Sequence, residues 1–193
     1  MKVVTAPDFI IPNRNKYVTV FLAGGITNCP DWQSETINEL KKFEVENNKE
    51  LNLIVYNPRR ESFDIDTESE RDKQIEWEFK YINSVDIFSM YFCNSESVQP
   101  ICMYELGMRI GRLMERPAID SHRGCRTVVS IEKGFKREYD IYKQLNLACW
   151  EIGINYNATP YSHAMHIIME YMLIADEKFA QEICRERINN DYQ

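Results

Sequence analysis

The sequence predicts an α/β protein, and two patterns support this class. Short runs rich in β-branched and aromatic residues alternate with longer segments in which apolar residues recur every three or four positions. The first two short runs end at Gly24-Gly25 and at Asn57-Pro58, which are typical strand stops. The chain has 193 residues, 44% of them hydrophobic and 27% charged, and both values are ordinary for one globular domain.

The elements follow from these patterns in order. Buried strands are predicted at residues 17–23, 51–56, 85–92 and 126–131, and residues 148–150 are a candidate start of a short fifth strand. Residues 1–15 contain two prolines and no clean period, so we expect an irregular arm there. Helices are predicted in the segment that carries Trp32, Thr36, Leu40 and Phe43, and at residues 67–83, 101–114, 136–146 and 161–187.

Three of these helices have start signals, and Ser97-Val-Gln-Pro100 opens the third of them. Pro30 suits the first turn of the first helix, with Asn28 or Cys29 as its candidate cap. The second helix begins at Thr67-Glu-Ser-Glu70, which matches a capping box.

Strands that alternate with helices form right-handed βαβ units. We therefore expect a flavodoxin-like three-layer sandwich with a 4–5-stranded, mainly parallel sheet and a C-terminal helical extension. Residues 1–193 are predicted to form a single domain, with a core at about 16–150 and the C-terminal helix at about 161–187. Ligands of such sheets bind beyond the carboxyl ends of the strands, so the loops at those ends are the candidate site.

Charge and spacing exclude several functions. Lys and Arg number 23 and Asp and Glu 30, and the resulting net charge of -7 is unfavourable for binding nucleic-acid phosphates. Six scattered cysteines without a Cys-x-x-Cys pair predict reduced thiols in a cytoplasmic protein. The three histidines lack zinc-ligand spacing, so we expect no metal. No cofactor is expected either. Neither a signal peptide nor an 18-residue apolar stretch is found, so no membrane contact is expected.

Two of the strand-end loops are candidate ligand contacts. Gly24 and Gly25 let the backbone approach a ligand, and the next helix N-terminus favours an anion; the alternative is a tight turn without a ligand. Asn57 and Pro58 are followed by Arg59 and Arg60, whose guanidinium groups suit anions. The alternative for the arginines is pairing with the nearby acids Glu61, Asp64 and Asp66.

Two glutamates fall on helix faces that are predicted to be apolar. Glu78 shares its face with Ile75 and Ile82, and Glu105 lies on the inner face of the next helix. A buried carboxylate is costly unless it is paired or functional, so both are candidates for catalysis. The alternative is that each forms a salt bridge with a neighbouring arginine. Gly107 inside the helix predicts the close approach of another element, because glycine costs about 1 kcal/mol there relative to alanine.

Seven motifs occur together in one order. They are Phe21-Leu-Ala-Gly-Gly-Ile26, Asp31-Trp32-Gln33, Asn57-Pro-Arg-Arg60, Gln74-Ile-Glu-Trp-Glu78, Val85-Asp-Ile87, Ser97-Val-Gln-Pro-Ile101 and Tyr104-Glu-Leu-Gly107. In this order the motifs resemble the nucleoside 2-deoxyribosyltransferase family, and most of all its branch with an Asn-Pro-Arg-Arg loop and a Trp-Glu pair. The resemblance covers roughly residues 16–131, and the helix 161–187 lies outside it.

The resemblance implies N-glycosidic chemistry on a 2'-deoxyribonucleoside. Glu105 matches the glutamate that attacks the anomeric carbon and forms a covalent deoxyribosyl-enzyme. Glu78 matches the acid that handles the proton of the base. Gly24 and Gly25 match the loop beside base or sugar, although many relatives have serine at the second position. Glu105 has to be ionised, which the N-terminal turns of its helix favour, and apolar neighbours are expected to raise the pKa of Glu78.

Four more residues are candidate substrate contacts. Trp32 can stack on a base, although a core position is the alternative. Asn57 and Arg59 belong to a strand-end loop, and Ser97 precedes the helix of Glu105. Three functions stay open: base exchange between deoxynucleosides and free nucleobases, hydrolysis of 2'-deoxynucleoside 5'-monophosphates, or a non-enzymatic nucleotide-binding module. Hydrolysis of the monophosphate requires a phosphate pocket, for which Ser95, Ser97 and Arg59 are the candidates.

The predicted C-terminal helix suggests assembly. Met165, Ile168, Met172 and Phe179 form an apolar stripe on it, and large exposed apolar patches are rare on monomers. We expect a homo-oligomer, a dimer or a higher even-numbered assembly, through this helix and residues 101–114, as the family resemblance also implies. The alternative is that the stripe packs within one subunit.

Overall fold

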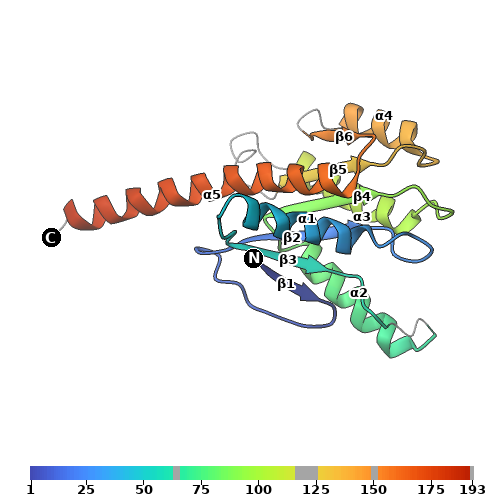
Figure 1. The fold of residues 1–193 in the computed structure, drawn as a ribbon, viewed down its shortest axis with the longest axis horizontal. Helices are drawn as coiled ribbons and strands as arrows, with labels where there is room; N and C mark the ends of the chain where they lie inside the picture. The colour runs from blue at the N-terminus through green and yellow to red at the C-terminus, as the bar shows by residue number, and fades with distance from the viewer. Residues whose placement is uncertain (63–65, 116–125, 149–151, 192–193) are drawn as a thin grey trace.

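The structure is a computed structural model that describes residues 1–62, 66–115, 126–148 and 152–191, with side chains as far as Gln181. Its centre is a sheet of six parallel strands in the order β1-β3-β2-β4-β5-β6 (Figure 1). The strands are β1 (Lys2–Thr5), β2 (Val18–Gly24), β3 (Leu53–Asn57), β4 (Ile87–Phe92), β5 (Arg126–Ile131) and β6 (Ile154–Tyr156). The predicted α/β, flavodoxin-like class is confirmed, and the sheet exceeds the four or five strands expected.

The additional strand lies in the segment that was expected to be an irregular arm. Residues 2–5 form β1, which pairs in parallel with β3 at the edge of the sheet, Val3 opposite Val55. The two prolines that suggested an arm come after the strand, at positions 7 and 12. At the other edge, β6 begins at Ile154, and most of the expected strand start at 148–150 lies outside the described residues.

Five helices join the strands. They are α1 (Trp32–Glu46), α2 (Glu68–Ile82), α3 (Pro100–Met114), α4 (Glu138–Ala148) and α5 (Pro160–Asp191). The cap of α1 is Asp31, whose Oδ1 accepts a hydrogen bond from Ser34 N at 3.1 Å, and neither Asn28 nor Cys29. Thr67 precedes α2 as predicted, but its hydroxyl makes no capping hydrogen bond.

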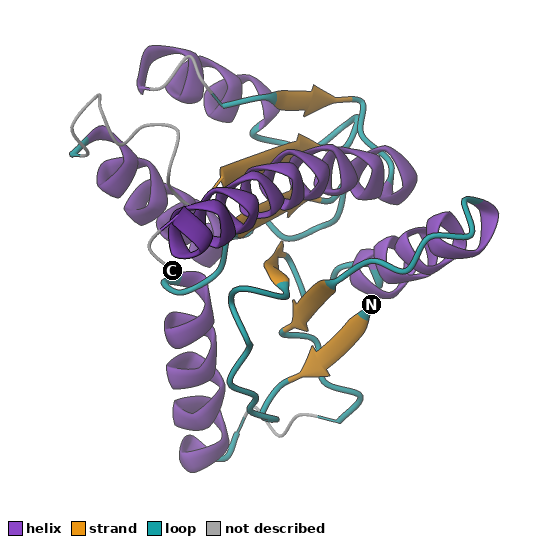
Figure 2. Ribbon diagram, turned by 90° about the vertical axis from the view of Figure 1, so that its left-hand side faces the viewer, coloured by secondary structure: helices purple, strands orange, loops and turns teal. Residues whose placement is uncertain are grey.

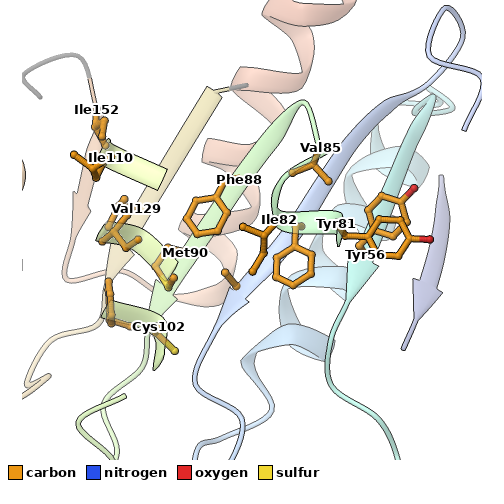
Figure 3. Packing of buried hydrophobic residues seen from close by; sticks show 14 of the residues in the cluster. Tyr56, Tyr81, Ile82, Val85, Phe88, Met90, Cys102, Ile110, Val129 and Ile152 are labelled. Atoms are coloured by element: carbon orange, nitrogen blue, oxygen red, sulfur yellow. The ribbon is translucent and has the colours of Figure 1, made fainter. Parts of the chain in front are cut away.

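The helices cover both faces of the sheet (Figure 2). One buried cluster joins the sheet to α2, α3 and α4, and Figure 3 shows part of it, including Tyr81, Ile82 and Cys102. A second cluster joins the opposite face to α1 and α5. β2 serves both clusters, because Phe21 and Ala23 belong to the first and Val20 and Leu22 to the second. A strand buried on both faces reads as a continuous apolar run, which is why β2 was predictable.

The order of the strands creates a switch point between β2 and β4. The chain leaves β2 through α1 on one face, and it leaves β4 through α3 on the opposite face. The loops after these two neighbouring strands therefore diverge at the carboxyl edge of the sheet. Such a divergence is where open α/β sheets hold ligands.

The long helix α5 docks through a buried histidine. His163 Nε2 lies 2.6 Å from Ser89 Oγ of β4, and His163 Nδ1 lies 2.7 Å from Ser130 Oγ of β5. Much of the predicted apolar stripe packs within the chain: Ile168 is buried, and Met172 packs against the second cluster. Phe179 is 65% exposed. The C-terminal part of α5 extends beyond the sheet (Figure 1). Among the described residues, we find no helix with the length and hydropathy of a membrane span.

Candidate active site

A cavity of about 250 Å³ lies at the switch point. Its walls come from the end of β2 and the following loop, from Pro58 after β3, from α2, and from the start of α3. The lining residues are Phe21, Ala23, Gly24, Gly25, Ile26, Thr27, Pro58, Glu78, Ser97, Gln99, Pro100, Ile101, Cys102 and Glu105. Five of the eight predicted site residues line this cavity, and they include both predicted carboxyl groups: Gly24, Gly25, Glu78, Ser97 and Glu105.

Glu78 and Glu105 are the only charged side chains among the described lining residues. Burial raises the pKa of Glu105 to about 8, and the charge of Glu78 adds to this shift. Burial also raises the pKa of Glu78, and this effect outweighs the hydrogen bond from Gln74, which lowers the pKa. Neither carboxyl group forms a salt bridge within the described part of the chain. The alternative prediction, that each glutamate pairs with a neighbouring arginine, is therefore wrong for the described residues. Two raised pKa values in one cavity are typical of acid/base sites.

Gln74 supports Glu78 and was not singled out from the sequence. Its Nε2 donates to Glu78 Oε1 at 2.7 Å and to the carbonyl of Pro58 at 2.8 Å. The amide thereby fixes α2 to the loop after β3. The signal in the sequence is the i, i+4 spacing of an amide and a carboxylate on one helix face.

The helix faces differ in part from the prediction. Ile82 is buried, but Ile75 is 61% exposed, so Glu78 lies at the border of the apolar face and not among apolar residues on both sides. On α3, a Cβ atom at Gly107 would meet nothing within 4 Å. Among the described residues, no other element therefore approaches Gly107 in the way that was expected.

The glycine loop is shaped by close packing. Gly24 has a φ of +153°, and a Cβ atom there would lie 2.4 Å from the carbonyl oxygen of Tyr91. A Cβ atom on Gly25 would lie 2.4 Å from Cys29 Sγ and 2.7 Å from Gln99 Cδ. A side chain at position 24 would clash with the backbone of Tyr91, and one at position 25 would require Cys29 and Gln99 to shift, so the packing seen here does not favour a hydroxyl contact from residue 25.

The loop before α3 brings two polar side chains to the cavity. Ser97 lines it, and its Oγ accepts a hydrogen bond from Gln99 N at 3.1 Å. Gln99 is 3% exposed and contacts the glycine loop, since its Oε1 accepts from Gly25 N at 3.2 Å. The motif Ser97-Val-Gln-Pro-Ile101 contains Gln99 but predicted no role for it. Its position directly before a helix-starting proline was the available signal.

Three predicted contacts lie behind the cavity wall instead of in it. Trp32 is 1% exposed, stacks on Tyr91 at 4.9 Å between ring centres, and donates from Nε1 to the carbonyl of Gly25 at 2.9 Å. Trp32 is therefore a residue of the hydrophobic core, which was the alternative to stacking on a base. Asn57 Oδ1 accepts from Arg59 N at 3.0 Å, which shapes the turn after β3. These residues support the walls from outside.

Arg59 braces the loop between β2 and α1. Its Nε lies 2.8 Å from Gln33 Oε1 and 3.1 Å from Asp31 Oδ1, and its Nη2 donates to the carbonyl of Pro30 at 2.8 Å. Arg60 forms an ion pair with Glu70 at 2.7 Å, a partner that the sequence had not suggested. Within the described ranges, no three His, Cys, Asp or Glu side chains gather as a candidate metal site.

Fold and cavity define an α/β protein with an acidic ligand site at the switch point of a parallel sheet. A family model described as "Nucleoside 2-deoxyribosyltransferase like" matches residues 17–119, more than half of the chain, and the chain belongs to this family. The predicted family is thus confirmed, while the branch with the Asn-Pro-Arg-Arg loop stays a prediction. A search of curated proteins gave no match. Membership supports, in general terms, an enzyme of deoxyribosyl transfer or glycosidic cleavage that acts on nucleosides and nucleobases.

Proposed function

We propose that the protein is a nucleoside 2-deoxyribosyltransferase that exchanges the base of a 2'-deoxyribonucleoside through a covalent intermediate on Glu105. The observation that carries this proposal is the pair of carboxyl groups, Glu78 and Glu105, that line one small cavity with raised pKa values.

The two acids have complementary roles in this reaction. The carboxylate of Glu105 attacks C1' of the sugar, the C1'–N bond breaks, and the departing base takes a proton from Glu78. A second base then attacks C1', releases Glu105 and returns a proton to Glu78. The transition states resemble an oxocarbenium ion, which a nearby carboxylate stabilises.

The roles require a charge on Glu105 and a proton on Glu78, and because the pKa of Glu105 is about 8, the reaction is expected to become faster as the pH approaches that value. Two neighbouring buried acids favour the state that holds a single proton between them, and they titrate as a pair. The helices add a small bias in the required direction. Glu105 lies in the second turn of α3, toward its positive N-terminal end, and Glu78 lies in the next-to-last turn of α2, toward its negative end.

The lining favours a nucleoside over a nucleotide as substrate. The described lining residues include no Arg, Lys or His, and two acids would repel a phosphate. Arg59, a candidate phosphate ligand, is engaged with Gln33, Asp31 and Pro30. Hydrolysis of a 2'-deoxynucleoside 5'-monophosphate is therefore the second candidate, for which Ser97 remains the available contact. A non-enzymatic binding module would not need two buried acids.

One experiment separates the three functions. The protein is incubated with a deoxynucleoside or its 5'-monophosphate, with and without a second free base, and the products are separated by chromatography. Base exchange that needs the acceptor supports the proposal. Free base released by water alone from the monophosphate supports the hydrolase, and no turnover supports the binding module.

We also propose that the protein works as a homo-oligomer, a dimer or a higher even-numbered assembly. α3 carries exposed apolar side chains next to the cavity, Ile101 at 64% and Tyr104 at 65% exposure. Further along the same helix, Gly107 and Gly111 leave open space above the backbone, and Met114 is 63% exposed. An apolar face with small residues suits the close approach of a second copy.

A further inference from the structure

Gln99 joins three segments that form the cavity wall. It is the last residue before α3, it is buried, and its backbone is left-handed, with φ 50° and ψ 55°. A residue other than glycine in this conformation costs free energy and persists only where surrounding contacts hold it. The contacts of the Gln99 side chain provide this hold.

The amide of Gln99 links the two strands that flank the switch point. Its Oε1 accepts from Gly25 N at 3.2 Å, and its Nε2 donates to the carbonyl of Cys93 at 2.7 Å. Weaker contacts run from Nε2 to Cys93 Sγ at 3.3 Å and to Ser95 Oγ at 3.5 Å. The orientation of the amide is determined, because a flipped amide would face donor to donor at Gly25 and acceptor to acceptor at Cys93.

This link sets the spacing across the cavity. Gly25 and Gln99 both line it, and Gln99 begins the helix that carries Glu105. The loop and the amide are packed without slack, since a Cβ atom on Gly25 would lie 2.7 Å from Gln99 Cδ. A shift of the amide would therefore move the glycine loop relative to α3.

We propose that Gln99 is a positioning residue whose neutral amide sets the distance between the glycine loop and the carboxyl group of Glu105. The proposal rests on the function proposed above. Only an uncharged side chain with one donor and one acceptor satisfies both Gly25 N and the Cys93 carbonyl. Glutamate would leave that carbonyl without a donor and would add a third carboxylate to a cavity that holds two.

Two variants of similar size test the two parts of this role. Gln99→Met removes the hydrogen bonds without adding charge, and Gln99→Glu adds charge. Both should lower kcat by about ten- to a hundredfold, because small displacements of reacting groups are costly. Only Gln99→Glu should move the acidic limb of the pH profile to higher pH, since a further negative charge disfavours ionisation of Glu105.

The control is Ser130→Ala, which removes a buried hydrogen bond to His163 on the opposite face of the sheet. This variant should lower the melting temperature and keep kcat and the pH profile of the wild type. A Gln99→Met variant with wild-type kcat, or a Gln99→Glu variant with an unshifted pH profile, would overturn the positioning role.

Two measurements need no turnover, so they separate failure of this inference from failure of the proposed function. Amide hydrogen exchange should show Gly25 N–H protected in the wild type and exchanging at least about ten times faster in Gln99→Met. The pKa values of ¹³C-labelled glutamate carboxyl groups in the cavity, followed by NMR, should rise in Gln99→Glu only. A wild-type Gly25 amide without protection would overturn the link itself, even for a protein without activity.

Discussion

At the scale of single residues, the proposed base exchange depends on the burial of Glu78 and Glu105 in one cavity. Glu105→Ala should abolish turnover and leave the fold intact, because the proposed mechanism assigns the attack on the sugar to this carboxylate. The measurement is base exchange under saturating substrate. An Ala variant that kept more than about a tenth of the wild-type rate would exclude covalent catalysis through Glu105, since a nucleophile supplies several kcal/mol.

The same residue predicts a pH dependence of stability. The folded-state pKa of Glu105 is raised from 4.5 to about 8, so wild-type stability is lost as the pH rises through this window. Glu105→Gln lacks the buried charge. Near pH 4 the variant should have no advantage over the wild type in the free energy of unfolding. As the pH rises, its advantage should grow by up to about 1.4 kcal/mol per pH unit, and it should level off above pH 8. Urea unfolding at four pH values measures it, and an advantage that did not change with pH would contradict the burial of this charge.

The role of Glu78 is tested through the leaving group. Glu78→Gln cannot donate a proton, so it should slow the reaction of substrates with poor leaving bases more than that of substrates with good ones. Single-turnover rates for a series of bases measure the difference. An equal loss for all bases would leave Glu78 a purely structural role.

At the scale of elements, the docking of α5 predicts acid sensitivity. Burial, with a smaller contribution from His166, lowers the pKa of His163 to about 3, so this histidine is neutral in the folded protein. The unfolded chain takes up a proton as the pH falls below about 6.5, and stability should fall at up to about 1.4 kcal/mol per pH unit from this group.

The variant His163→Asn isolates the contribution of this histidine. It should be less stable than the wild type at pH 8, with a shallower loss between pH 6.5 and 4.5. His166, whose pKa burial also lowers, remains in both proteins and cancels in the comparison. Equal slopes in urea unfolding would mean that His163 is not the group that responds to acid.

The elements also show what a sequence can and cannot predict. β2 and β4 were predictable because a strand buried on both faces is a continuous apolar run. β1 was not, since four residues are too short to show a period, and its partner β3 lies about fifty residues further on. Glu78 and Glu105 were found from helix position and resemblance. The roles of Trp32 and Arg59 were not, because their partners come from distant segments that only the fold brings together.

At the scale of the whole molecule, the exposed face of α3 predicts assembly. Light scattering during gel filtration should give at least twice the chain mass of 22.9 kDa. A Cβ atom at Gly111 would meet no atom of the described residues within 4 Å, so Gly111→Glu should fold normally and split the assembly. Gln144→Glu adds the same charge on exposed α4 and should keep the assembly. A wild-type mass near 23 kDa with full activity would contradict the oligomer.

The position of β1 has a consequence for the behaviour of the protein in concentrated solution. β3 is apolar from Leu53 to Tyr56 and buried throughout, and β1 covers the hydrogen-bonding groups along its outer side. A β3 without this cover would present a bare apolar edge, the kind of surface on which strands of other molecules add and aggregates grow. By covering the edge of β3, β1 thus protects the sheet from self-association, and it does so away from the cavity.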